Sequence, residues 1–249
     1  MIRSISILFS IAAVQSIISA GAYELSPIVA QFSSEGPGSS RSFVIRNTHQ
    51  QPIALQIEVF KRSADALGNE TREPEYDDFI VTPPQMVIAP GNSQSIRAQW
   101  VGEANPETEL AYRFVVTQLP IRFERDNSDE DVNIDVAMGY KYEAAIYVLP
   151  DGGKPSAEVS KSEAILNEDG EETLRVTINS VGERRAILIS PTLSVTGNNQ
   201  NIDITGEALA PLNNKNILAG TQTVVELPWP ESLPFGDVSA TLKTQYFSQ

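Results

Sequence analysis

Apolar and polar residues alternate with a period of two along much of this chain, which is the pattern of β-strands that bury one face. The clearest early pair is 42–45 and 53–60, separated by the turn-like Asn-Thr-His-Gln at 47–50, and it predicts two antiparallel strands. Further strands are predicted at 86–88, 95–101, 112–118, 132–148, 174–179, 186–189, 224–227 and 238–247. Because helical periodicity is nearly absent, the sequence predicts an all-β fold class.

Proline, glycine and asparagine clusters separate the predicted strands, as they do in sandwiches of short antiparallel strands. The strongest interruption is 150–155, Pro-Asp-Gly-Gly-Lys-Pro, in which two prolines and two glycines stop any strand ladder near the middle of the chain. We therefore expect two immunoglobulin-like β-sandwich domains, one over 23–150 and one over 151–249. Each has roughly the 100 residues usual for this fold.

The first 22 residues have the features of a signal peptide. Arg3 is the only charged residue before Glu24, residues 5–18 are mostly apolar, and Ala-Gly-Ala at 20–22 is a small-x-small cleavage pattern. An uncleaved N-terminal anchor is the alternative. No other stretch approaches the roughly 20 apolar residues of a membrane-spanning helix, so we expect no membrane insertion of the mature chain. A bacterial periplasm is the simplest location.

Composition excludes several function classes. The 249 residues include no cysteine and one histidine, and the chain has a formal net charge of −14. Disulfides, thiolate zinc sites and cysteine nucleophiles are excluded, and an acidic chain is unsuited to nucleic acid. His49 lies in a predicted turn, and Trp100 and Trp229 fit a core better than a sugar-stacking platform. The acidic pairs at 77–78 and 171–172 fall in turns. We therefore predict no catalytic group, no metal and no cofactor.

The alternation is longest in 132–148, where one face is apolar at nine successive even positions. A strand of this length would extend over roughly 55 Å, far beyond a typical strand of five or six residues. It would overrun the core of its own domain and leave part of its apolar face without an internal partner. Alternatively, a bulge at Gly139 divides it into two ordinary core strands.

The first domain resembles the N-terminal domain of PapD-like periplasmic pilus chaperones. The matching pieces occur in the family's order at 43–47, 81–84, 88–91, 95–97 and 112–122, followed by the long strand that ends at Pro150. The resemblance covers roughly 23–150 and implies two immunoglobulin-like sandwiches set at an angle, with a cleft between them.

The resemblance also implies a mechanism. A pilin subunit lacks the last strand of its sandwich, and the chaperone lends its own long strand until the subunit passes to an outer-membrane usher, a known form of β-strand addition. The donor residues would be Val132, Ile134, Val136, Met138 and Tyr140. No ATP motif is needed.

The chain departs from the common branch of this family. There, an arginine near the start of the first strand and a lysine on the long strand hold the subunit's C-terminal carboxylate, whereas Val29 and Ala145 stand at the corresponding positions here. The block 112–122 instead resembles archaic chaperones that serve spore-coat-like pilins, in which an arginine of this strand is the anchor. This resemblance assigns the role to Arg113, with Arg97 and Arg122 as further candidates. Alternatively, Arg113 pairs with a neighbouring acid on a solvated sheet face.

Three function classes follow. The leading hypothesis is a non-enzymatic assembly chaperone whose partners are pilin subunits and an usher. A structural or adhesive immunoglobulin-like component of a surface fibre is the alternative. A secreted carbohydrate-active enzyme with paired carboxylates is the third class.

Overall fold

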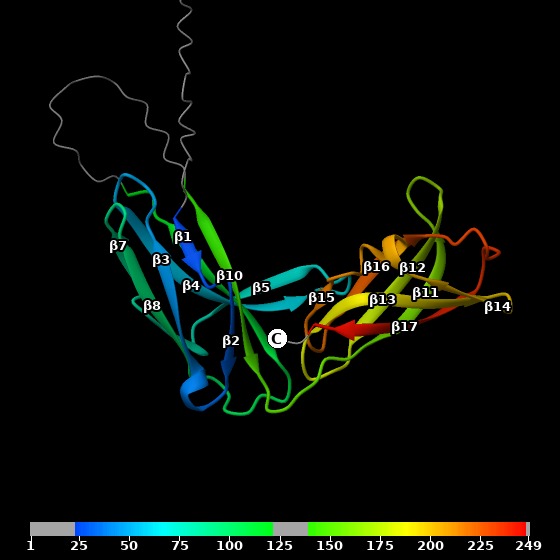
Figure 1. Cartoon of the computed structure of the whole chain (residues 1–249), viewed down its shortest axis with the longest axis horizontal. Coiled ribbons are helices and arrows are strands. Elements are labelled where there is room, and N and C mark those ends of the chain that lie inside the picture. The colour runs from blue at the N-terminus through cyan, green and yellow to red at the C-terminus, as the bar shows by residue number, and fades with distance from the viewer. Residues whose placement is uncertain (1–22, 122–138, 248–249) are drawn as a thin grey trace, which may run out of the picture.

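The structure, a computed structural model, describes residues 23–121 and 139–247 and is built from β-strands with two short 3-10 helices, η1 (Gly36–Ser39) and η2 (Gly206–Leu209) (Figure 1). The first domain contains β1 (Glu24–Ser26), β2 (Val29–Ser33), β3 (Ser40–Arg46), β4 (Ile53–Ala64), β5 (Glu70–Glu75), β6 (Phe79–Thr82), β7 (Gln85–Ile88), β8 (Ser93–Trp100), β9 (Leu110–Gln118) and β10 (Lys141–Leu149). The second contains β11 (Ala157–Leu166), β12 (Glu172–Ser180), β13 (Ala186–Gly197), β14 (Gln200–Ile204), β15 (Asn216–Ile217), β16 (Gln222–Pro228) and β17 (Val238–Tyr246). The predicted all-β class with two sandwich domains is confirmed.

Two sheets face each other in the first domain. One has the order β1-β3-β8-β6, and the other has the order β2-β10-β9-β4-β5, with β7 also paired to β4. Phe43 of the first sheet stacks on Phe114 of the second, with ring centroids 4.3 Å apart. Trp100 lies in this core, as predicted.

The expected antiparallel pair of 42–45 with 53–60 is wrong. β3 pairs with β1 and β8, whereas β4 pairs with β9, β5 and β7 in the opposite sheet. The connection between β3 and β4 crosses from sheet to sheet at the buried Asn47, whose Nδ2 donates to the carbonyls of Gln51 (2.8 Å) and Ile88 (2.9 Å). Alternation therefore identified both strands but not their partners, because each strand satisfies the same pattern against any neighbour.

The predicted long strand is described only from residue 139 onward, where β10 begins at Lys141. Along β10 the even residues Ala144, Ile146 and Val148 are buried in the first-domain core. The odd residues Ala145 and Tyr147 are buried on the opposite face, in a small cluster that includes Leu218 of the second domain. This strand therefore belongs to the core on one face and to the domain interface on the other.

The second domain pairs the sheet β11-β12-β16 with the sheet β14-β13-β15, and β17 also pairs with β13. The strand predicted at 186–189 is only the start of β13, which continues to Gly197 across an irregularity between Ile189 and Thr192. Trp229 is buried in this core, as predicted. In the described residues, no helix is long and apolar enough to cross a membrane.

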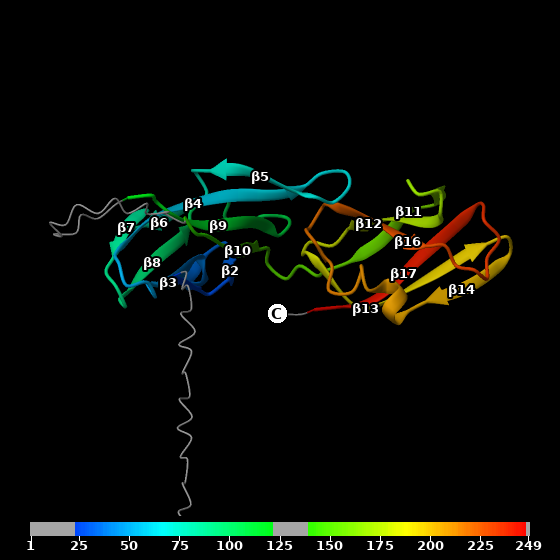
Figure 2. The same cartoon turned by 90° about the horizontal axis from the view of Figure 1, so that it is seen from above.

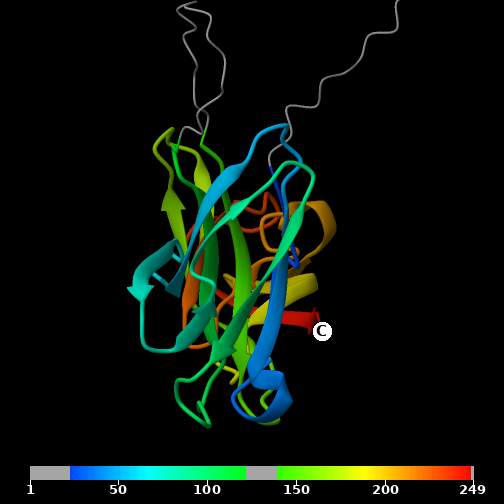
Figure 3. The ribbon, with the colours of Figure 1, turned by 90° about the vertical axis from the view of Figure 1, so that its left-hand side faces the viewer.

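The domains meet along several contacts. β10 ends at Leu149 and β11 begins at Ala157, so 150–156 connects the two sandwiches. The β4–β5 hairpin reaches over to the second domain (Figure 2), where the backbone N–H of Val224 donates to the carbonyl of Leu67 at 3.1 Å. Viewed from the first-domain end, β5 lies at one side of that domain (Figure 3). The tip of the β4–β5 hairpin, at the edge of the first domain's larger sheet, therefore contacts the second domain.

Candidate functional site

The register of three neighbouring strands brings together Val29, Ala145 and Arg113, the positions that the family resemblance singled out. Ala145 of β10 pairs with Val29 of β2 on one side and with Arg113 of β9 on the other. Directly opposed residues of a sheet share a face. A cation therefore lies one strand away from Ala145 and two strands away from Val29.

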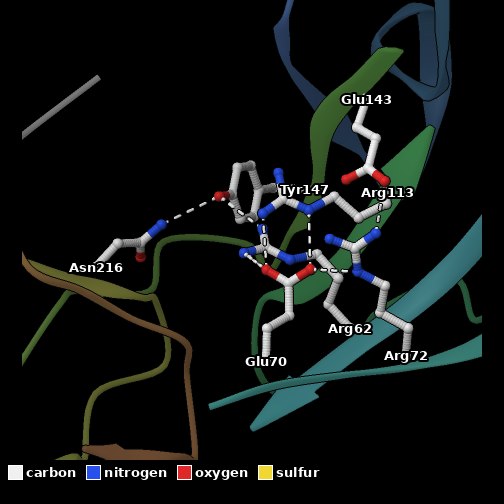
Figure 4. A network of polar contacts seen from close by, with 7 residues as sticks. All are labelled: Arg62, Glu70, Arg72, Arg113, Glu143, Tyr147 and Asn216. Carbon is white, nitrogen blue, oxygen red and sulfur yellow. Dashed lines mark hydrogen bonds and ion pairs between the residues drawn. The ribbon is translucent and has the colours of Figure 1, made fainter. Parts of the chain in front are cut away.

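Arg113 belongs to an arginine cluster, which we define as Arg62, Glu70, Arg72, Arg113 and Glu143 (Figure 4). Arg113 donates through Nε to Oε1 of Glu70 at 3.0 Å and through Nη2 to Oε2 at 2.7 Å, which is bidentate pairing. Arg62 Nη2 donates to Oε2 of Glu70 at 2.7 Å, and Arg72 Nε donates to Oε1 at 2.6 Å. One carboxylate thus accepts hydrogen bonds from three guanidinium groups.

Strand pairing explains why these side chains converge. Arg62 of β4 is paired with Arg72 of β5, and Phe60 of β4, two residues before Arg62, is paired with Arg113. Residues two apart on a strand point to the same face. Since Phe114 on the opposite parity of β9 is buried in the core, the arginines occupy the outer face of the sheet.

The electrostatics of the cluster are dominated by Glu70. Partial burial would raise the pKa of its carboxyl group, but hydrogen bonds from Arg113, Arg62 and Arg72 outweigh burial and lower that pKa to about 2. Arg72 also donates to Glu143 at 2.7 Å, which lowers the pKa of Glu143. Glu70 is therefore ionised at neutral pH.

The cluster carries a local excess of positive charge. Counting Lys141, whose Nζ lies 3.8 Å from Oε1 of Glu143, four cations share the two carboxylates among the described residues. This local balance stands out in a chain with a net charge of −14. An added carboxylate would be favoured here and disfavoured over most of the surface.

The cluster borders a pocket of ≈ 190 Å³ between the domains. Arg62 and Glu70 line it from the first domain, and Lys215 and Asn216 line it from the second. The hydroxyl of Tyr147 accepts from Arg62 Nη1 at 3.1 Å and from Asn216 Nδ2 at 3.2 Å (Figure 4). This tyrosine therefore links the arginines to the second domain.

The other candidate residues do not join the cluster. Arg97 is exposed on β8 of the opposite sheet, where its Nε donates to Ser40 Oγ at 2.7 Å. Tyr140 packs against the first-domain core. Five candidates lie outside the described residues: Arg122, Val132, Ile134, Val136 and Met138.

Arg113 does pair with an acid, as the alternative interpretation expected, but the face is not simply solvated. The Arg113 side chain is only 22% exposed and that of Arg62 only 8%. Sequence analysis missed Arg62, Glu70 and Arg72. Parity along β4 could have placed Arg62 on the outer face, but nothing in the sequence specified that β5 returns beside it.

The described residues thus form two immunoglobulin-like sandwiches with a cation cluster at their junction. Among the described residues there is no group of three His, Cys, Asp or Glu suited to a metal. Residues 32–152 match the family model for the pili and flagellar-assembly chaperone, PapD N-terminal domain. The first domain of this chain belongs to the PapD-like pilus chaperones, a non-enzymatic family.

Solved structures share this fold at low sequence identity. The structure of the chaperone and tip-subunit complex CsuC–CsuE from the archaic Csu pili of Acinetobacter baumannii matches with a TM-score of 0.59 and 16% identity, covering 88% of this chain and 92% of the other. The class 5 fimbriae chaperone CfaA matches with a TM-score of 0.55 and 17% identity, covering 90% and 100%. The E. coli chaperone DraB matches with a TM-score of 0.50 and 16% identity, covering 87% of each chain. No curated protein sequence gives a significant match.

Proposed function

We propose that this protein is a periplasmic chaperone that binds pilin subunits by donor-strand complementation and delivers them to an outer-membrane usher. The observation that carries the proposal is the family match over residues 32–152, which spans nearly the whole first domain. The similar CsuC structure is that of a chaperone bound to a tip subunit, which supports subunit binding as the activity.

The donor strand is assigned from the sequence pattern. In the sequence, Val132, Ile134, Val136 and Met138 have the same even parity as Ala144, Ile146 and Val148 of β10, so they belong to the same predicted alternation. Backbone pairing along an edge is indifferent to sequence, whereas alternate apolar side chains fill the groove of a subunit. Four such side chains contribute of order 6 to 12 kcal/mol when fully buried, before the costs of association.

Replacing Ile134 and Val136 together by Asp tests this assignment. The double variant should lose recovery of the subunit while remaining folded, because the charges are desolvated without a partner only in the complex. Asn133→Asp, on the other face of the strand, is the control and should retain capture. Normal co-purification of the double variant would contradict donation by this segment, and its unfolding would favour an ordinary core strand.

Arg113 is the proposed anchor for the subunit's terminal carboxylate. It lies opposite Ala145, one of the two positions that lack a charge, and a guanidinium fork matches a carboxylate. Arg62 and Arg72 support the same function by concentrating positive charge around it.

A structural or adhesive fibre protein is the second candidate function, since the same sandwiches could serve as fibre modules. The two functions differ in where the protein is found. A chaperone co-purifies with a small pilin at one to one and is absent from sheared fibres, whereas a fibre component is present in them.

A further inference from the structure

Glu70 already makes the interactions that a bound terminal carboxylate would make. Its two oxygens accept from Nε and Nη2 of Arg113 and from one nitrogen each of Arg62 and Arg72. The Glu side chain and a peptide's C-terminus present the same carboxylate group. A subunit terminus that reached the fork of Arg113 would therefore meet Glu70 in its place.

We propose that Glu70 occupies the carboxylate position of the anchor in the free chaperone and is displaced by the subunit's terminal carboxylate. The proposal rests on the proposed function. It specifies which group occupies the anchor site before a subunit binds. Glu70 is then a specificity-determining residue, because only a ligand that brings its own negative charge can replace it.

Position in the sheet indicates which partner moves. The Arg62 and Arg113 side chains rise from β4 and β9 in the interior of the sheet. Arg62 is also held by the hydroxyl of Tyr147. Glu70 is the first residue of β5, the edge strand of this sheet, and its side chain is 25% exposed. The carboxylate can therefore turn into water while the arginines keep their positions.

The backbone of the hairpin does not have to move with it. The tip just before Glu70 is fastened to the second domain, since Leu67 accepts from the Val224 N–H and Gln222 Nε2 donates to the Ala66 carbonyl at 2.7 Å. At Gly68, with φ of +85°, an added Cβ would lie 2.6 Å from Cα of Thr223. The exchange thus amounts to a side-chain rotation within a fixed hairpin.

Exchange of one carboxylate for another has a physical consequence. The three arginines share one carboxylate at this position in both states, so neither state leaves the partly buried cations without that partner. The affinity for a subunit is lower than the arginines alone would provide, because Glu70 competes. Subunit release is correspondingly easier.

The test is a competition for a pilin subunit that co-purifies with the wild-type chaperone. A limiting amount of this subunit is mixed with wild type and a tagged variant, and the amount bound to each is measured at equilibrium. Glu70→Gln keeps the shape of the side chain but competes only as a neutral group. The difference between charged and neutral hydrogen bonds, about 1 kcal/mol, corresponds to about a fivefold preference for the variant. Glu226→Gln, which breaks an exposed ion pair with Arg175 in the second domain, is the matched control and should show no preference.

A second probe is the same subunit extended by two C-terminal glycines, which moves its carboxylate out of position. The preference for Glu70→Gln should disappear with it. Equal or weaker capture of the native subunit by Glu70→Gln overturns displacement and makes Glu70 a residue that orients Arg113. A preference that persists with the extended subunit overturns it as well. Failure of the wild type to capture any pilin instead overturns the proposed function, and the role of Glu70 with it.

Discussion

At the scale of single residues, the arginine cluster places a cation next to a position that carries no charge in this chain. Ala145 is paired with Val29 of β2 on one side and with Arg113 of β9 on the other. What matters to a carboxylate is the position of the guanidinium fork, not the strand from which it comes. Two more arginines from β4 and β5 strengthen the field there.

Replacement of Arg113 tests the anchor directly. Losing one partner of a desolvated charge pair typically costs about 2 to 5 kcal/mol, so Arg113→Ala should weaken subunit capture at least tenfold, a factor of about 1.4 kcal/mol. Arg113→Lys should recover only part of it, because a point charge cannot make the bidentate pair. Arg97→Ala, on the opposite sheet, should capture normally. If Arg97→Ala fails while Arg113→Ala succeeds, the anchor lies elsewhere.

Glu70 should also contribute a pH dependence to stability. Its folded pKa of about 2 lies below the ordinary value of 4.5. The stabilisation is therefore complete above pH 4.5 and is lost as the pH falls from there toward 2. Urea midpoints of wild type and Glu70→Gln should differ at pH 7 and converge in this acidic window. A difference that stays constant down to pH 2 would show that Glu70 is not the titrating group.

At the scale of elements, the connection from β3 to β4 decides which sheet each strand joins. Asn47 is fully buried there, and besides its two donated bonds its Oδ1 accepts from the backbone N–H of His49 at 2.8 Å. Its own backbone N–H donates to the carbonyl of Asn92 at 2.8 Å. The amide side chain of Asn47 thus makes hydrogen bonds to the backbone where a β-hairpin would have made strand-to-strand bonds.

Removing that amide should destabilise the first domain. Asn47→Ala leaves the carbonyl of Ile88 buried without its donor and removes the bond to the carbonyl of Gln51, at a cost of about 1 to 3 kcal/mol. Urea unfolding measures the loss. The neighbouring Gln50 is exposed, so Gln50→Ala should stay within about 0.5 kcal/mol of wild type. Equal stabilities for the two variants would mean that Asn47 does not hold the crossing.

At the scale of the whole molecule, a buried ion pair joins the two domains. Arg185 Nη1 donates to Glu109 Oε1 at 2.8 Å, and the two side chains are 6% and 1% exposed. The guanidinium carbon of Arg185 lies 3.7 Å from the ring centroid of Tyr147. Since Tyr147 also contacts Arg62, this one residue touches both the ion pair between the domains and the arginine cluster.

Breaking this pair should uncouple the domains. Glu109→Ala leaves Arg185 buried without its carboxylate, which typically costs about 3 to 5 kcal/mol. Calorimetry should show the domains unfolding in more clearly separated transitions than in wild type. Glu226→Ala removes an acid from a pair whose side chains are 42% and 44% exposed and should change the profile little. Identical profiles for the two variants would contradict coupling through Glu109.

The sequence by itself determined many of the strands, the sandwich class and the family resemblance, but it did not predict β5 or β11. A period of two follows from local geometry, because successive side chains of any strand point to opposite faces. The same local pattern placed Ile146 on an apolar face, which is buried in the core. These features need no knowledge of which strand lies beside which.

Only the tertiary structure decided the pairings and the composition of the site. β3 and β4 separate into opposing sheets, and β5 returns beside β4 so that Glu70 meets Arg113 from 43 residues away in the chain. Both outcomes depend on contacts between distant segments, for which many partners satisfy the same alternation. Arg113 could be proposed as the cation of the site from the sequence of β9 alone. Its partner Glu70 could not, because it reaches Arg113 only when β9, β4 and β5 lie side by side.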